Sequence, residues 1–275
     1  MKKNGDDVWP KQSRIRELVL RPEQKGTLES AGTSSGAPGL SNCYYFMLEL
    51  SKLASKGILW VGTALGAPYV SHLIKNSIAL ITGTTSSGDH AVGTGTLVVR
   101  GTVLTCAHVI TDMTIDDHIK IGRERVRVVD QLSDTSVDVG VLMLEQPKEP
   151  LPDLGFRRAI ELEEVIVPGY PTIPRGLAPT LTVQRGEIVG RAEHTFEGHP
   201  IELFSAIARP GNSGGPVVAM DGRIVGLVSR SLERPQEAAD AVIPLPFFSA
   251  IPSDVIQTSF RNLTNGIELP WETYA

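Results

Sequence analysis

Ser213 lies in a segment rich in backbone-permissive residues, Arg209-Pro210-Gly211-Asn212-Ser213-Gly214-Gly215-Pro216. Glycine tolerates positive φ and lets another backbone come close, so we expect a tight turn that presents the Ser213 hydroxyl. A serine hydroxyl is a useful nucleophile only when a base takes its proton, and the resulting oxyanion needs fixed N–H donors. The amides of Gly211 and Ser213 are the candidate donors. A glycine-rich loop between strands would have the same composition, so this interpretation requires a base and an acid elsewhere.

His108 is the candidate base, and Asp138 is the candidate acid that would orient it. His108 lies near the end of the β-branched and apolar run 101–110, which predicts a buried strand that delivers the histidine at its end. Asp138 precedes the apolar run 139–144, where an ionised carboxylate is costly unless it is paired. A lone histidine in such a setting is more often structural. Asp134 is a competing acid, although its neighbours are typical of a solvated loop.

The residues occur in the order His, Asp, Ser, and their neighbours resemble the motifs of the trypsin-like (chymotrypsin-fold) serine peptidases. Thr105-Cys106-Ala107-His108 is similar to the T-A-A-H motif of that family, and the segment from Gly211 to Pro216 is similar to G-D-S-G-G-P. Three further segments, 93–98, 167–171 and 221–226, resemble family strands and turns. The resemblance covers about residues 75 to 265 and is closest to the HtrA/Deg branch, without a PDZ domain.

Asn212 departs from the pattern of the digestive and clotting enzymes, which carry Asp at this position. In zymogen-type relatives that Asp pairs with a newly cut N-terminal amine and so shapes the oxyanion turn. An amide cannot form the charge pair. The hypothesis is therefore that activity does not depend on a new N-terminus inserted beside Ser213.

The resemblance implies an all-β fold of two six-stranded antiparallel β-barrels, an N-terminal helical extension and a short C-terminal helix. His108 and Asp138 would lie on the first barrel and Ser213 on the second. The implied activity is that of a serine endopeptidase: His108 takes the proton of Ser213, an acyl-enzyme forms, and Asp138 holds the imidazole. The alternative is a latent or inactive module that binds or is regulated by a protein partner.

The same resemblance suggests which residues bind substrate. Ile207 would lie at the base of the S1 pocket, and its apolar side chain favours an apolar residue at P1, because burying a Lys or Arg without a partner is costly. Arg209 could instead reach into the pocket and favour an acidic residue. The wall of the pocket would include Ala208 and Arg209, and the substrate backbone would pair as an added strand with Ser229, Arg230 and Ser231.

Composition sets limits on partners and cofactors. The formal net charge is −5 and the isoelectric point is about 5.7, so we expect neither nucleic acid nor an anionic membrane as partner, and a protein or peptide as substrate. The six histidines lack metal-ligand spacing, so we expect no metal and no cofactor. Two cysteines give no disulfide framework, and residues 1–7 lack the apolar core of a signal peptide, which favours a cytoplasmic location.

Strand-length apolar runs bounded by Gly, Ser, Thr and Asp divide the chain into a peptidase domain, 71–275, and an extension, 1–70. The barrels are expected at about 71–147 and 153–250, joined by a proline-rich crossover, with a helix at about 253–264. Expected strands are 77–82, 95–99, 103–109, 118–121, 125–130, 139–144, 164–167, 180–189, 201–206, 216–220, 223–229 and 241–243.

The extension begins with a polar stretch over residues 1–40 that becomes rich in Gly, Ser and Pro from Glu29 to Ser41, which predicts a flexible or loosely attached arm. Apolar residues then recur at helical spacing, which predicts an amphipathic helix over 43–56. The apolar run 57–70 is too short to span a membrane. Three roles remain open for the extension: packing on the barrels, self-association or docking of an activating partner, and interfacial membrane anchoring.

Overall fold

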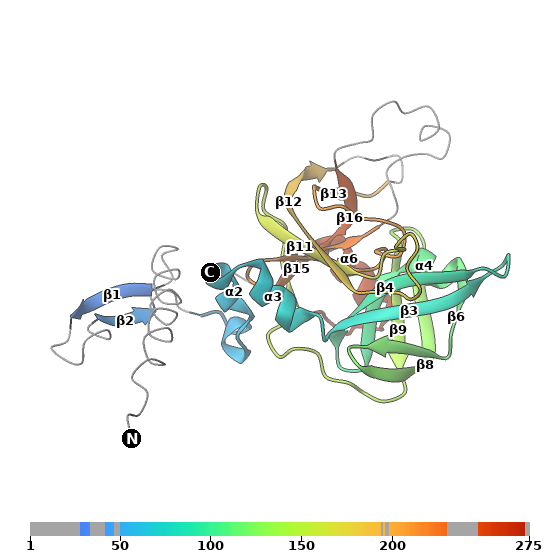
Figure 1. Cartoon of the computed structure of the whole chain (residues 1–275), viewed down its shortest axis with the longest axis horizontal. Helices are drawn as coiled ribbons and strands as arrows, with labels where there is room; N and C mark the ends of the chain where they lie inside the picture. The colour runs from blue at the N-terminus through green and yellow to red at the C-terminus, as the bar shows by residue number, and fades with distance from the viewer. Residues whose placement is uncertain are drawn as a thin grey trace, which may run out of the picture.

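The computed structural model describes residues 28–33, 42–46, 50–193, 195, 198–229 and 247–272. Its main body consists of two closed antiparallel barrels (Figure 1). They confirm the predicted all-β fold class.

The first barrel has the strand order β4-β5-β9-β8-β7-β3 and is closed by pairing of β3 with β4. A short seventh strand, β6, pairs with β3 outside the closed ring. The alternation of buried and exposed residues along β7 and β8 is what a half-buried strand requires. By contrast, β5 is buried throughout and β9 is buried except at Met143, because both of their faces are covered. The bounds are β3 Ile78–Thr85, β4 His90–Val99, β5 Thr102–Cys106, β6 Met113–Ile115, β7 His118–Ile121, β8 Glu124–Asp134 and β9 Val139–Leu144.

The second barrel has the order β15-β14-β11-β12-β13-β16 and is closed by pairing of β15 with β16. A two-residue strand, β10, adds to β15 in parallel. Helix α6 (Ser253–Leu263) follows β16 and packs against β8, β9 and β15, so it bridges the two barrels. The bounds are β10 Gly155–Phe156, β11 Glu164–Gly169, β12 Thr182–Ala192, β13 Ile201–Phe204, β14 Pro216–Ala219, β15 Arg223–Val228 and β16 Phe248–Pro252.

The last strand of the second barrel differs from the expected one. The sequence predicts a strand at 241–243, which lies outside the described residues, whereas the strand that closes the barrel is β16 at Phe248–Pro252. Its backbone pairs with both β13 and β15. Two prolines within 244–246 obscure the alternation that would otherwise have identified this strand.

The helical part of the extension is present but lies later in the chain than predicted. A helix over 43–56 is wrong for its first residues, because Asn42–Phe46 forms strand β2, which pairs antiparallel with β1 (Leu28–Thr33). The run Cys43-Tyr44-Tyr45-Phe46 contains aromatic residues that favour extended backbone. Helical turns follow only from Ala54 onward: η1 Ala54–Lys56, η2 Leu59–Val61, α2 Gly62–Leu65 and α3 Ala67–Ile74.

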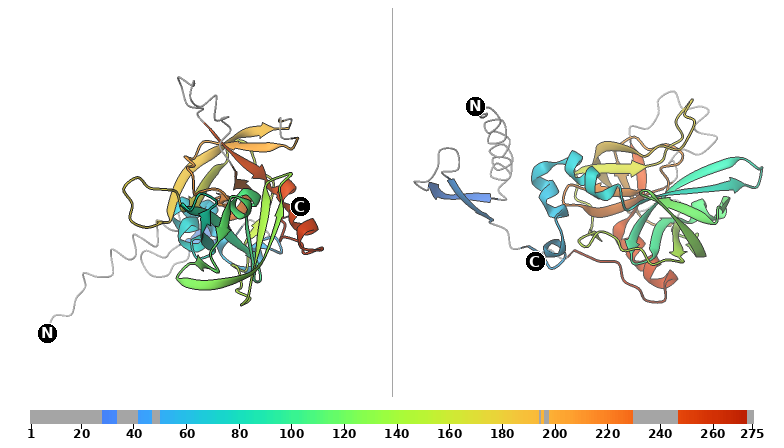
Figure 2. Two further views of the ribbon diagram at one scale, coloured as in Figure 1. Left: turned by 90° about the vertical axis from the view of Figure 1, so that its right-hand side faces the viewer. Right: turned by 60° about the horizontal axis from the view of Figure 1, so that its bottom comes forward.

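These helical turns pack on the barrels. Val70 and Ile74 of α3 are fully buried in the main hydrophobic core, together with Leu59 of η2. Helix α3 contacts β11 (Figures 1 and 2). No helix among the described residues is long and apolar enough to cross a membrane.

A buried ionic network connects the helical turns of the extension to the second barrel. Arg223, 1% exposed, donates from Nε and Nη2 to Glu272 Oε2 at 2.9 and 2.6 Å and from Nη1 to the Asp153 carbonyl at 2.7 Å. The Asp153 carboxylate accepts the Leu59 amide at 2.6 Å. The network therefore connects four segments that are distant in sequence.

Replacing Glu272 with alanine is expected to lower the free energy of unfolding by about 3–5 kcal/mol, because the Arg223 charge would stay buried without its partner. Urea denaturation followed by tryptophan fluorescence measures the change. The matched control is Glu149→Ala, which removes an ion pair with Arg100 whose side chains are 67% and 68% exposed and should leave stability nearly unchanged. Equal effects of the two substitutions would contradict the prediction.

Candidate active site

His108 and Asp138 meet because two neighbouring strands end together. In the β5–β9 ladder Cys106 is paired with Val139, so the residues just beyond that pair leave the sheet on the same side. His108 lies in the first turn of α4 (Ala107–Thr111), which follows β5 directly. Asp138, at φ 59°, adopts the left-handed conformation that Asp tolerates better than most residues.

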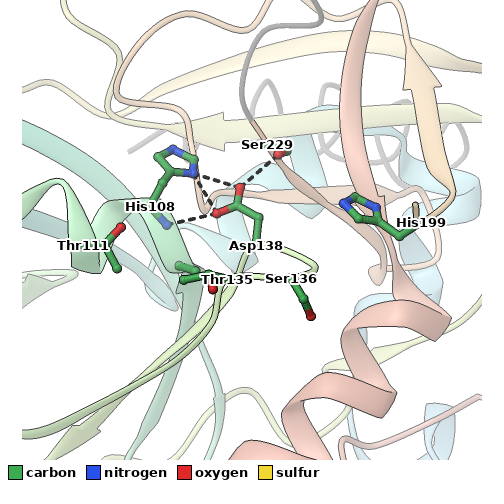
Figure 3. Close-up of a pocket in the computed structure, with 8 residues that line it drawn as sticks. His108, Thr111, Thr135, Ser136, Asp138, His199 and Ser229 are labelled. Atoms are coloured by element: carbon green, nitrogen blue, oxygen red, sulfur yellow. Dashed lines mark hydrogen bonds and ion pairs between the residues drawn. The ribbon is translucent and has the colours of Figure 1, made fainter. Parts of the chain in front are cut away.

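The two side chains form a close pair (Figure 3). His108 Nδ1 lies 2.9 and 2.8 Å from Asp138 Oδ1 and Oδ2, and the His108 amide donates to Oδ1 at 2.9 Å. A third donor, Ser229 Oγ, bonds to Oδ2 at 3.0 Å. The carboxylate thus holds both the backbone and the ring of the histidine.

These contacts favour the ionised form of the Asp138 carboxyl group. Burial by itself would raise the pKa of Asp138, but the hydrogen bonds and charge of His108, with the Ser229 hydroxyl, hold that pKa below its ordinary value. An ionised carboxylate only accepts, so Nδ1 carries the proton in the neutral imidazole and Nε2 has a free lone pair. The arrangement leaves Nε2 able to accept a proton.

Asp134, the competing acid, binds elsewhere. Its carboxylate accepts the amide and hydroxyl of Ser136 and the hydroxyl of Ser259 on α6. It makes no hydrogen bond to His108 among the described residues. Its contacts instead order the turn that precedes Asp138.

Ser213 lies on the turn between β13 and β14. Asn212 N donates to Arg209 O at 2.9 Å and Gly215 N to Asn212 O at 2.9 Å. Gly211, at φ 97°, must be glycine, because a Cβ there would lie 2.3 Å from the Tyr170 carbonyl oxygen. Within the described part of the chain, the amides of Gly211 and Ser213 donate to no acceptor. Two free N–H groups beside one hydroxyl are what an oxyanion hole requires.

The turn lies next to the His108–Asp138 pair. Gly214, which follows Ser213, packs so closely on the end of β5 that a Cβ would lie 3.0 Å from Cys106 N. Two pockets lie side by side here. His108 and Asp138 line a pocket of about 560 Å³, and Ser213 lines a pocket of about 430 Å³. Ser229 lines both of them. The two pockets therefore share a wall. No hydrogen bond joins Ser213 Oγ to His108 in the described structure.

Comparison with known proteins identifies the domain. Residues 93–227 match the family model described as a trypsin-like peptidase domain. The chain carries a trypsin-like peptidase domain. The matched range contains His108, Asp138 and Ser213.

Relatives of this peptidase domain are of the HtrA or Do-like type. Protease Do-like 14 of Arabidopsis thaliana is 29% identical over 225 residues, which cover 74% of this chain and 47% of that protein. Serine protease HTRA4 of Mus musculus is 28% identical over 222 residues, covering 76% and 41%. The chain thus spans less than half the length of these relatives.

Solved structures share the fold of the peptidase domain. The active form of the Rv3671c protease from M. tuberculosis aligns with a TM-score of 0.58 at 20% identity, over 75% of this chain and 88% of that one. The serine endoprotease from Yersinia pestis aligns with a TM-score of 0.56 at 21% identity, over 72% and 66%.

The pocket beside Ser213 is mostly apolar. Besides Ser213 and Ser229 it is lined by Ala208, Arg209, Pro210, Val228, Phe248 and Ser249. Of the residues predicted to bind substrate, Ala208, Arg209 and Ser229 lie here. Ile207 is 47% exposed and is not among the lining residues, and Arg230 and Ser231 lie outside the described residues.

Sequence reasoning missed two residues that line this candidate site. Phe248, on β16, lines the pocket and packs against Phe204, with ring centroids 6.1 Å apart and the rings tilted by 33°. Its role depends on β16 closing the barrel, and the local sequence carries no signal of that closure. His199, from the β12–β13 connection, lines the pocket that His108 and Asp138 also line, and it lies across from Asp138 (Figure 3).

One set of potential metal ligands exists among the described residues. Cys106, His108 and Asp138 offer ligand atoms that lie within 4.8 Å of one another. Cys106 is fully buried, however, and its thiol donates to the Val228 carbonyl at 3.2 Å. The other two form the acid–base pair described above, so these groups already have partners.

Proposed function

We propose that this chain is a serine endopeptidase that uses His108, Asp138 and Ser213 as its catalytic triad. The observation that carries the proposal is the pairing of His108 with a partly buried carboxylate beside a turn whose two free amides flank the Ser213 hydroxyl. The family and the HtrA-type relatives support a peptide or protein as substrate. Apo hydrogen bonds of catalytic groups are often long, so the absence of a His108–Ser213 bond is compatible with this role.

The proposed reaction is acyl transfer to water. Ser213 Oγ attacks the peptide carbonyl carbon while His108 Nε2 removes its proton, and the carbonyl oxygen becomes an oxyanion held by the amides of Gly211 and Ser213. The imidazolium, stabilised by Asp138, returns the proton to the leaving amine as the C–N bond breaks. Water then attacks the acyl-enzyme by the same route, which releases the acid and regenerates the Ser213 hydroxyl.

The pocket beside Ser213 supports cleavage after an apolar residue. Pro210, Val228 and Phe248 supply apolar walls, and no carboxylate is among the described residues that line this pocket. A Lys or Arg side chain at P1 would therefore lose hydration without gaining a charged partner. Val, Leu, Ala and Met are the expected P1 residues.

A fluorophosphonate probe and a peptide library test the proposal on the full chain. The probe is expected to label Ser213, located by mass spectrometry, and the library to be cleaved after apolar residues. Cleavage after Lys or Arg would overturn the specificity, and cleavage after acidic residues would show that Arg209 turns into the pocket. If the probe fails to label Ser213 and no polypeptide is cut, the chain is not a serine peptidase.

A further inference from the structure

Thr94, a residue of the first barrel, forms hydrogen bonds to the turn of the second barrel that carries Ser213. We call this turn, residues 209–216, the catalytic turn. Thr94 lies on β4, is fully buried, and its backbone amide donates to the Ser213 carbonyl at 3.0 Å. Its hydroxyl donates to the Gly211 carbonyl at 2.6 Å and accepts the Tyr170 amide at 3.0 Å. Its own carbonyl accepts the Thr105 hydroxyl at 2.7 Å. All four polar functions of Thr94 are therefore used.

The catalytic turn needs such anchors because glycine does not hold its own conformation. Gly211 can exchange between backbone conformations at little intrinsic cost, and each exchange would rotate a peptide plane and turn its N–H away from substrate. The N–H of a trans peptide points opposite to the carbonyl of the same plane, so fixing a carbonyl fixes the direction of the next amide.

Two external hydrogen bonds fix Gly211 on both sides. The Pro210 carbonyl accepts the Thr172 amide at 2.9 Å, which directs the Gly211 N–H to the opposite side of that peptide. The Gly211 carbonyl is held by the Thr94 hydroxyl, which fixes the next peptide plane. The first anchor is a backbone group, whereas the second is a side chain that can be substituted.

We propose that Thr94 is a positioning residue: by binding the Gly211 carbonyl it holds the Gly211–Asn212 peptide, which lies between the two peptides whose N–H groups, those of Gly211 and Ser213, stabilise the oxyanion. The proposal rests on the proposed peptidase function. Without the hydroxyl, the buried Gly211 carbonyl and the buried Tyr170 amide both lose their hydrogen-bond partner. A rotated Gly211–Asn212 peptide whose carbonyl finds another donor then has a free energy similar to that of the present orientation. The substrate-binding surface, by contrast, does not include Thr94.

The matched control lies two residues away on the same strand. Thr96 is also fully buried, but its hydroxyl has no hydrogen-bond partner among the residues that the structure describes. Thr96→Val therefore removes a hydroxyl of the same kind without breaking a bond to the turn. Thr94→Ser keeps the hydroxyl and loses only a methyl group.

The test measures kcat and KM for a peptide substrate in the full-length wild type and three variants. It also measures the inhibition constant of a peptide aldehyde, which forms a tetrahedral adduct with the serine. Thr94→Val is expected to lower kcat roughly 10- to 100-fold with KM within about twofold, since removing an oxyanion donor outright costs 10²–10³. The inhibition constant of the aldehyde should rise by the same factor by which kcat/KM falls. Thr94→Ser should restore activity to within about threefold, and Thr96→Val should match the wild type.

Other outcomes decide against the proposal. Equal losses in Thr94→Val and Thr96→Val, or a loss explained by the unfolded fraction in a thermal melt, would assign Thr94 a purely structural role. If the wild type hydrolyses nothing, the proposed function fails, and a crystal structure of Thr94→Val still tests the inference. If neither the Gly211–Asn212 peptide nor the neighbouring peptides that carry the Gly211 and Ser213 amides had moved in that structure, the inference would be overturned.

Discussion

Replacing Ser213 with alanine is expected to lower kcat/KM by roughly 10⁴- to 10⁶-fold. Without the hydroxyl no acyl-enzyme forms, and only direct attack by water remains, assisted by the free amides of the turn. The rate of hydrolysis of a peptide with an apolar P1 residue, followed by chromatography, measures the loss. KM for that peptide should change little, because the Ser213 hydroxyl forms no hydrogen bond in the described structure.

The same variant should remain folded, which the control must show. Its thermal midpoint should lie close to that of the wild type, and the fluorophosphonate probe should no longer label it. Ser55→Ala is the matched control, since Ser55 is an exposed serine whose hydroxyl donates to the Lys52 carbonyl, far in sequence from the turn that carries Ser213. Activity of Ser213→Ala within tenfold of the wild type would rule out Ser213 as the nucleophile.

Replacing Asp138 with asparagine is expected to lower kcat by about 10⁴-fold. The side-chain amide can donate where the carboxylate could only accept, so Nδ1 becomes the acceptor and the ring proton moves to Nε2. The imidazole then has no lone pair for the Ser213 proton. Asp134→Asn is the matched control, because this acid bonds to Ser136 and Ser259 instead and its loss should leave kcat within a few-fold. The opposite ranking would make Asp134 the catalytic acid.

The Asp138 substitution should also change the acid stability of the protein. The pKa of Asp138 is lowered in the folded chain, so the ionised carboxylate stabilises the fold above its ordinary pKa of about 3.9, and this stabilisation is lost as pH falls through the lowered value. Asp138→Asn removes this contribution. Its stability in urea should therefore fall less steeply than that of the wild type below about pH 4, and parallel curves would contradict the assignment.

The secondary structure of the extension was only partly predictable from the sequence. Its helical spacing was visible, but the residues from Asn42 to Phe46 form a strand because β1 offers a partner for their backbone. The helical turns lie where Leu59, Val70 and Ile74 can be buried against the barrels. Strand pairing and burial therefore overrode the local pattern.

The sequence by itself determined the order of His108, Asp138 and Ser213, the strands that end beside the first two, and the glycine turn that carries the third. These are local properties, readable from residue type and spacing. Only the tertiary structure decided that Asp138 rather than Asp134 pairs with His108, that Phe248 lines the pocket beside Ser213, and that Thr94 binds the Gly211 carbonyl. Each of these depends on hydrogen bonds or packing between segments brought together by strand register and barrel closure, which no local sequence pattern specifies.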